Sequence, residues 1–309
     1  MFLHLLLAIV TFSMSMFSSV ADKTDLPPAW TQYELVAHGL GAIDSHTYTN
    51  TLEAFELNYK LGHRLFEVDL VLTSDNYLVT RNNWQPYLYK RFNQIAPPAG
   101  QKGKPLPLQE IKSMKVLDSY QILDFRDLLD LLRKYPDIYF ITDTKDGDQK
   151  RVEQQFSAML RAAGDDVQLL DRIIPQVYNQ LMFQQVDEIY PFSSYVYTLS
   201  KSPDTPSQVL SFVRENPRIQ AVTMPETIAS ARFLKQLKRA GVKTYINTIN
   251  DTEKMEHYLQ QGGYGFYTDS VTYTEFEAVR PKPRNKHLWF EGIKNVLLLP
   301  TIIPMLDWS

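Results

Sequence analysis

The sequence predicts a single-domain (β/α)8 barrel, or TIM barrel, of the α/β class. Eight short apolar runs alternate with amphipathic segments along the chain, which is typical of parallel strands joined by helices. A chain of 309 residues is also an ordinary length for one such barrel. An open doubly wound sheet is the alternative, but no glycine-rich dinucleotide-binding turn follows the first apolar run.

The expected strands are the apolar runs rich in β-branched and aromatic residues. They span residues 33–39, 65–73, 138–145, 172–177, 194–199, 219–225, 242–248 and 265–269. Between them, Asp124 is expected to begin a helix as its N-cap, and Gly62 and Gly241 are expected to end two others. His63 follows Gly62, where a cation would suit the helix dipole, and we interpret it as structural.

Residues 83–123 contain Pro97, Pro98, Gly100, Gly103 and Pro105 and are expected to form a long loop. In a barrel, a loop that follows the second strand lies over the C-terminal face, where substrates bind.

Composition excludes several classes of protein. Hydrophobic residues make up 44% and charged residues 22%, which is typical of a globular chain with a full core. The formal net charge of −3 argues against a nucleic-acid binder, which usually carries a strongly basic face. The absence of cysteine excludes disulfides, thiolate zinc sites and a cysteine nucleophile.

The two ends of the chain differ from its middle. Residues 1–21 are expected to be a signal peptide, because an apolar stretch from Phe2 to Met16 precedes the small residues Ser19-Val20-Ala21. Cleavage near Ala21 would export the barrel, residues 22–280, to the periplasm or the medium. No Lys or Arg precedes the apolar stretch, so a short hydrophobic anchor is the alternative.

Residues 281–309 are expected to form a C-terminal tail. Its apolar run, 296–306, is too short to span a bilayer and contains Pro300 and Pro304. Packing on the barrel is the simpler interpretation, and peripheral membrane contact through 288–308 is the alternative.

Polar side chains stand at the C-terminal ends of the expected strands, where barrel enzymes place their chemistry. They are His38, Glu67, Asp69, Asp143, Lys145, Gln176, Thr223, Asn247 and Asp269.

Glu67 and Asp69 are two residues apart on one strand, so both side chains point to the same face. Together with Asp143 from the next strand they would repel one another, and a hard divalent cation, Ca²⁺ or Mg²⁺, would relieve this repulsion. A structural ion pair of Glu67 with Lys145 or Arg81 is the alternative.

Several motifs, in one order along the chain, resemble the glycerophosphodiester phosphodiesterase family, which is related to phosphatidylinositol-specific phospholipases C. The matching pieces are Ala37-His38, 50–55, Gly62, 67–69, 72–75, Asp143-Thr-Lys145, 248–253 and 265–269. The likeness extends over about residues 33–270, nearly the whole expected mature chain.

This resemblance implies a barrel that binds Ca²⁺ or Mg²⁺ through Glu67, Asp69 and Asp143. It also implies two histidines acting as general acid and base, of which the first is His38, with Lys145 stabilising charge on the phosphodiester. For substrate contacts we expect polar residues at or near the barrel mouth: Arg81, Asn50, Gln176 and Asn247.

The chain departs from the family pattern at three places. The family's Arg-Gly after the first histidine is Gly39-Leu40 here, and its Pro-Glu before Asn-Thr is Tyr48-Thr49. The second catalytic histidine falls on Asn82, and the aspartate after it on Asn83. An amide forms hydrogen bonds but has no accessible pKa for proton transfer. The role of the second histidine would then fall to His46, to Arg81, or to a water molecule with His38 as the sole proton carrier.

We therefore expect an exported, metal-dependent phosphodiesterase acting on a small or lipid-derived phosphodiester such as a glycerophosphodiester or a phospholipid head group. The alternative is a catalytically impaired relative that binds such a ligand without efficient turnover. A lyase using Lys145 as a Schiff-base amine is disfavoured, because Asp143 and Asp146 would raise the lysine pKa.

Overall fold

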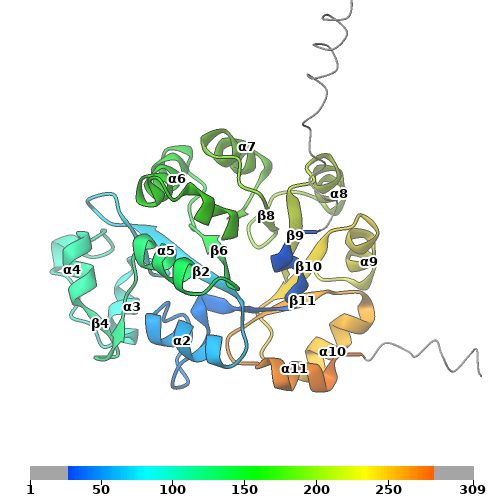
Figure 1. Ribbon diagram of the computed structural model, residues 1–309, viewed down its shortest axis with the longest axis horizontal. Coiled ribbons are helices and arrows are strands. Elements are labelled where there is room, and N and C mark those ends of the chain that lie inside the picture. The colour runs from blue at the N-terminus through cyan, green and yellow to red at the C-terminus, as the bar shows by residue number, and fades with distance from the viewer. Residues whose placement is uncertain (1–26, 282–309) are drawn as a thin grey trace, which may run out of the picture.

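The computed structural model describes residues 27–281 and shows a closed barrel of eight parallel strands ringed by helices (Figure 1). Strands pair in the order β1-β11-β10-β9-β8-β7-β6-β2, and β1 pairs with β2 to close the ring. They are β1 (Leu35–Ala37), β2 (Leu65–Leu72), β6 (Tyr139–Asp143), β7 (Ile173–Val177), β8 (Tyr195–Thr198), β9 (Ile219–Pro225), β10 (Lys243–Asn247) and β11 (Gly265–Thr268). The predicted TIM barrel is confirmed, and each strand end lies within two residues of its expected position.

Helices follow the strands and cover the outside of the barrel (Figure 1). They are α2 (Leu52–Lys60), α5 (Phe125–Lys134), α6 (Gln149–Ala163), α7 (Gln180–Ile189), α8 (Pro206–Glu215), α9 (Ala231–Arg239), α10 (Thr252–Gln261) and α11 (Tyr273–Val279), with 3-10 turns η1 (Ala29–Gln32), η2 (His38–Leu40) and η4 (Val167–Arg172). Asp124 caps α5 as predicted and forms a reciprocal capping box with Asp127. Gly62 and Gly241 follow α2 and α9 with φ of +101° and +81°, which suits glycine.

The interior of the barrel is apolar at its base and acidic at its mouth. The base is a buried cluster of Trp30, Val36, Leu65, Ile141, Ile174, Val196, Ala221, Tyr245 and Tyr267. Side chains alternate between the two faces of a strand, so Glu67 and Asp69 continue the inward face of Leu65. Asp143 continues that of Ile141 and is in register with Asp69. The acidic residues therefore project into the barrel above an apolar plug.

The segment after β2 is more ordered than a loop. Strand β3 (Leu78–Thr80) pairs antiparallel with the end of β2. After it come α3 (Pro86–Arg91), η3 (Ala99–Gln101), α4 (Leu108–Ser113), β4 (Lys115–Val116) and β5 (Tyr120–Gln121). We call residues 78–123 the excursion, and it lies to one side of the barrel (Figure 1).

The excursion has a hydrophobic core of its own, so the prediction of a long loop over 83–123 was wrong. This core consists of Val79, Trp84, Leu88, Tyr89, Phe92, Leu106, Ile111, Val116 and Ile122, and it packs against Val71 of β2. Two prolines of the segment start helices, since Pro86 is the first residue of α3 and Pro107 precedes α4.

The predicted signal peptide, residues 1–21, lies outside the described residues, as does the predicted tail beyond Pro281. Within residues 27–281, no helix is both long enough and apolar enough to cross a membrane.

His63 is a core residue rather than a cation at a helix end. Its side chain is 2% exposed and packs against Tyr273 and Phe66, with ring centroids 5.4 and 6.5 Å away. Burial lowers the pKa of His63 to about 4, opposed in part by a hydrogen bond to the backbone of Val271. The interpretation of His63 as structural holds, but the helix-dipole reason for it does not, because the neutral imidazole carries no charge.

The buried His63 makes the fold sensitive to acid. Its pKa is about 4 in the folded state and about 6.5 in the unfolded chain, so stability is complete above pH 6.5 and falls as pH drops through this window. Between pH 7.5 and pH 5 we expect His63→Phe to remove roughly 2 kcal/mol of the pH-dependent loss in the free energy of unfolding. Urea denaturation at both pH values measures it.

The exposed His257, changed to Phe, is the matched control and should leave the pH dependence as it is in the unmodified chain. An unaltered pH dependence in His63→Phe would show that His63 is not the group responsible, whatever the substitution does to stability at pH 7.5.

Candidate metal centre at the barrel mouth

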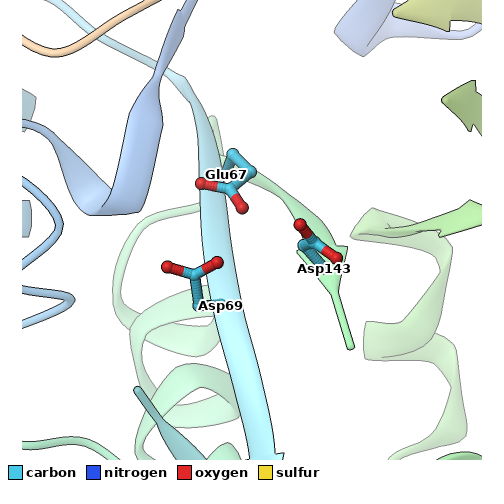
Figure 2. Close-up of side chains that lie close together, drawn as sticks. All are labelled: Glu67, Asp69 and Asp143. Atoms are coloured by element: carbon cyan, nitrogen blue, oxygen red, sulfur yellow. The ribbon is translucent and has the colours of Figure 1, made fainter. Parts of the chain in front are cut away.

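Three carboxylates meet at the mouth of the barrel. Glu67 and Asp69 on β2 and Asp143 on β6 turn toward a common point (Figure 2), and one oxygen of each lies within 4.8 Å of the others. All three are buried, with Glu67 1% and Asp69 0% exposed. Carboxylates this close would repel one another strongly unless positive charge or protons lie among them.

Backbone and amide groups hold two of these carboxylates in place. The Gly39 backbone N–H donates to Glu67 Oε2 at 2.7 Å. Asn50 Nδ2 donates to Asp69 Oδ2 at 2.9 Å, while Asn50 Oδ1 accepts from the Asp69 backbone N–H at 3.0 Å. The orientation of both carboxylates is therefore fixed by the fold.

Lys145 supplies positive charge to the cluster. Its ammonium lies 2.6 Å from Asp69 Oδ1 and also donates to Asp143 Oδ2. The second oxygen of Asp143 accepts from the Tyr178 hydroxyl. Burial would lower the pKa of Lys145, but the charges of Asp69 and Asp143 outweigh it and raise the pKa, so the ammonium stays protonated.

One lysine does not balance three carboxylates. Burial, reinforced by the charge of Asp69, raises the pKa of Glu67. Burial also acts on Asp69, but Lys145 and the Asn50 amide oppose it and lower the Asp69 pKa. The cluster thus has room for more positive charge.

The donor set fits a hard divalent cation. All three groups offer oxygen, the element that Ca²⁺ and Mg²⁺ prefer, and the oxygens lie close enough for one ion to contact them all. Asp69 Oδ1 is buried and has no hydrogen-bond donor in suitable geometry, although the Lys145 ammonium is 2.6 Å away. This oxygen is therefore available as a ligand.

His38 lies beside the carboxylates at the end of β1. Its Nδ1 is 3.0 Å from Asp269 Oδ1, and its Nε2 is 3.9 Å from Glu67 Oε2. The Thr248 hydroxyl is a second neighbour of Nδ1 at 3.2 Å. An ionised carboxylate only accepts hydrogen bonds, so Nδ1 carries the hydrogen and the lone pair of neutral His38 is on Nε2, on the side of the carboxylates.

The His38–Asp269 pair is tuned by its surroundings. Burial alone would lower the pKa of His38, but the hydrogen bond to Asp269 and the charge of Glu67 outweigh it, and the net pKa is raised. Asp269 shows the complementary effect, because its hydrogen bonds to His38 and Asn250 overcome burial and lower its pKa. The Tyr48 ring packs edge-on against His38, with centroids 4.5 Å apart.

Asn82 also contacts the carboxylate cluster. Asn82 follows the end of β3 by two residues, and its Nδ2 donates to Asp69 Oδ2 at 3.1 Å. The structure thus places Asn82 beside the carboxylate cluster.

The four residues expected to contact substrate occupy different environments. Asn50 is fully buried and bound to Asp69, so it supports a carboxylate instead of facing the pocket. Gln176 lies on the inward face of β7 and accepts from the Tyr267 hydroxyl at 3.0 Å. Asn247, at the end of β10, is partly exposed and lies 3.4 Å from the Ser200 hydroxyl.

Arg81 is directed away from the candidate site, contrary to the expectation that it contacts substrate. Its guanidinium lies 4.5 Å from the centre of the Tyr89 ring and donates to Gln94 Oε1 and to the Asn83 carbonyl oxygen. Strand alternation explains this, since Arg81 and Asn82 are successive residues and point to opposite sides. His46, the other residue considered as a substitute, is exposed on the loop after β1.

Three residues of the site were missed from the sequence. Asp269 was recognised only as a polar strand end, Tyr178 follows directly after β7, and Tyr48 belongs to the loop after β1. Position after a strand is the one signal that could have indicated the first two.

Comparison with known proteins points to one family. The family model described as "Glycerophosphoryl diester phosphodiesterase family" matches residues 41–272. No curated protein matches the chain significantly.

Two solved structures have the same fold. A glycerophosphodiester phosphodiesterase from Parabacteroides distasonis is 16% identical, with a TM-score of 0.63 and coverage of 80% of this chain and 96% of the other. A phosphodiesterase from Oleispira antarctica, solved with its product sn-glycerol-3-phosphate, is 16% identical, with a TM-score of 0.62 and coverage of 81% and 98%.

A divalent cation should stabilise the folded protein through the three carboxylates. At a concentration about a hundred times its Kd, a ligand adds about 2.7 kcal/mol, which for a domain of this size raises the Tm by roughly 5–10 °C. We expect this shift with Ca²⁺ or Mg²⁺, and its loss in Asp143→Asn. Differential scanning fluorimetry with and without the cation measures it.

Glu153→Gln is the matched control, because it also removes one negative charge but from the exposed face of α6. An equal shift in Asp143→Asn and in the unmodified protein would place the bound cation elsewhere.

Proposed function

Because the chain belongs to the glycerophosphoryl diester phosphodiesterase family, a family of phosphoric diester hydrolases, we propose that it hydrolyses a glycerophosphodiester or a phospholipid head group. The proposed cofactor is Ca²⁺ or Mg²⁺, held by Glu67, Asp69 and Asp143. A bound cation would polarise the phosphoryl group and offset its charge.

The observation that carries this proposal is the buried carboxylate cluster with His38 at its edge. A phosphodiester is an anion, and a pocket of three carboxylates would repel it without added positive charge. Lys145, which lies between Asp69 and Asp143, and a divalent cation held by the carboxylates would together supply that charge. The product sn-glycerol-3-phosphate bound to the Oleispira antarctica relative supports a glycerophosphate-type ligand.

His38 is the proposed proton carrier. Its Nε2 lone pair is on the side of the carboxylates and can take a proton from an attacking water or substrate hydroxyl. Asp269 fixes the tautomer and stabilises the imidazolium that forms. Lys145 stabilises charge and does not transfer a proton, because its pKa is raised by Asp69 and Asp143 despite burial.

The second candidate function is binding of such a ligand without efficient turnover. Asn82 motivates it, because this amide contacts Asp69 where the family pattern has a histidine. A catalytic acid or base contributes roughly 10²–10⁴-fold to rate, so its loss leaves a slow enzyme or a binding protein.

We also propose that the protein is exported after cleavage near Ala21 and that residues 288–308 pack on the barrel or, as the alternative, touch the membrane surface. The support for both proposals is in the sequence: an apolar N-terminal stretch with small residues after it, and an apolar C-terminal run broken by prolines.

Hydrolysis should depend on the cation and on His38. With Ca²⁺ or Mg²⁺ present, we expect release of a phosphomonoester or a cyclic phosphate from at least one of a panel of glycerophosphodiesters and phospholipid head groups. His38→Ala should lower kcat by roughly 10²–10⁴-fold because the proton carrier is lost, and EDTA should abolish turnover. Phosphorus NMR of the products measures both.

Turnover by the unmodified protein no faster than by His38→Ala, over the whole panel, would contradict hydrolysis. Saturable binding of the same compounds in that case would favour the second candidate function.

Export predicts a mature chain that begins at Asp22. N-terminal sequencing of the protein from a secreting host checks it, and retention of residues 1–21 would contradict it.

If the tail contacts the membrane, co-sedimentation with phospholipid vesicles should be lost when the chain ends at His287. Equal sedimentation of both forms would contradict membrane contact.

A further inference from the structure

The side-chain amides of Asn82 and Asn83 form a chain of hydrogen bonds with a fixed direction. The Gln85 backbone N–H donates to Asn83 Oδ1 at 2.8 Å, so Asn83 Nδ2 faces the other way. Asn83 Nδ2 donates to Asn82 Oδ1 at 2.8 Å and to the Tyr87 hydroxyl at 2.8 Å. Asn82 Nδ2 then donates to Asp69 Oδ2 at 3.1 Å.

The groups at the two ends of this series of hydrogen bonds both require the same orientation of the two amides. A backbone N–H only donates, so it requires the oxygen of Asn83, and a carboxylate only accepts, so it requires the nitrogen of Asn82. Turning either amide over would place two donors or two acceptors face to face. Asn82 is therefore held with its NH2 group toward the carboxylate cluster.

An amide held this way is a donor and nothing more. One N–H of Asn82 is used by Asp69, and the other remains for an oxygen of a bound ligand. Such a donor stabilises negative charge that develops on an oxygen, but it cannot deliver a proton to it.

Within the described part of the chain, no side chain outside the three carboxylates offers an acid beside Asn82. The hydroxyl of Tyr87 is reached only through Asn83, and the Arg81 guanidinium is turned toward Tyr89. The Lys145 ammonium is held between Asp69 and Asp143. His38 borders the cluster at Glu67, whereas Asn82 borders it at Asp69.

We propose that this site cleaves phosphodiesters whose leaving alcohol is acidic, such as a phenol or an enol, in preference to those that release an ordinary alkyl alcohol. The inference rests on the hydrolase function proposed above. Asn82 acts as the donor to the leaving oxygen, and His38 serves the nucleophile.

An acidic leaving alcohol can depart as an anion, so cleavage needs no proton from position 82. The oxygen of water, or of a substrate hydroxyl, forms a bond to phosphorus and loses its proton to His38 Nε2. The bond from phosphorus to the leaving oxygen breaks, and its electron pair leaves as an aryloxide or enolate hydrogen-bonded to Asn82. That anion takes a proton from water after release, and His38 returns its own to solvent.

The test compares two methyl phosphodiesters in the presence of the cation, one releasing 4-nitrophenol and one releasing an alkyl alcohol. In the unmodified protein we expect the aryl substrate to have the higher kcat/KM. The double change Asn82→His with Asn83→Asp should raise kcat/KM for the alkyl substrate by roughly 10²–10⁴-fold, the contribution of one general acid. The aryl substrate should change by less than about tenfold, since its leaving group needs little help.

Asn83→Asp is needed so that the new histidine at position 82 can carry a proton. Asn83→Asp keeps an oxygen for the Gln85 backbone N–H and presents an acceptor to the new imidazole. Asn82→His alone would face the Asn83 NH2 group, which favours the neutral imidazole, and should restore less. Gln101→His adds a histidine to an exposed position of the excursion and should leave both rates unchanged.

The outcomes separate this inference from the proposed function. An unmodified protein that cleaves both substrates at similar rates, or a double variant that speeds both equally, would overturn the leaving-group preference while the hydrolase function stands. No cation-dependent cleavage of either substrate, together with none over the panel of glycerophosphodiesters and phospholipid head groups, would overturn both. A cation-induced rise in Tm shows in each variant that the carboxylate cluster is intact.

Discussion

The mouth of this barrel is organised around mutual repulsion among three buried carboxylates. Glu67, Asp69 and Asp143 lie with their oxygens within 4.8 Å of one another and almost without solvent. Burying charge is costly unless it is paired, and Lys145 pairs with only two of the three. The remaining imbalance appears as the raised pKa of Glu67, and it gives the site its affinity for positive charge.

The fold holds these carboxylates in place with an apolar plug below them and hydrogen-bond donors around them. An apolar plug fills the barrel below the carboxylates, so they cannot retreat inward. The Gly39 backbone and the Asn50 side chain fix two of them from the first connection, and the excursion brings Asn82 to Asp69 from the other side. The excursion has its own core, which supports the segment that carries Asn82.

Much of this arrangement could be predicted from the sequence, because it follows from local rules. The eight strands are short apolar runs, and the two-residue spacing of Glu67 and Asp69 puts them on one face of a strand. The prolines and glycines of residues 83–123 predict a loop, whereas Pro107 lies at the start of a helix and the segment packs around its own core. Alternation along the chain turns Arg81 away from Asn82, but no local pattern indicates that it packs against Tyr89. The partnership of His38 with Asp269 joins residues 231 positions apart and requires the closed barrel.

The most direct test of a cation site built from these carboxylates is anomalous diffraction from crystals grown with Mn²⁺. We predict one strong anomalous peak at bonding distance, roughly 2.0–2.4 Å, from oxygens of Glu67, Asp69 and Asp143, with the Lys145 ammonium displaced from between Asp69 and Asp143. A structure without a peak at these three carboxylates, in which Lys145 still bridges the two aspartates at saturating Mn²⁺, would contradict it.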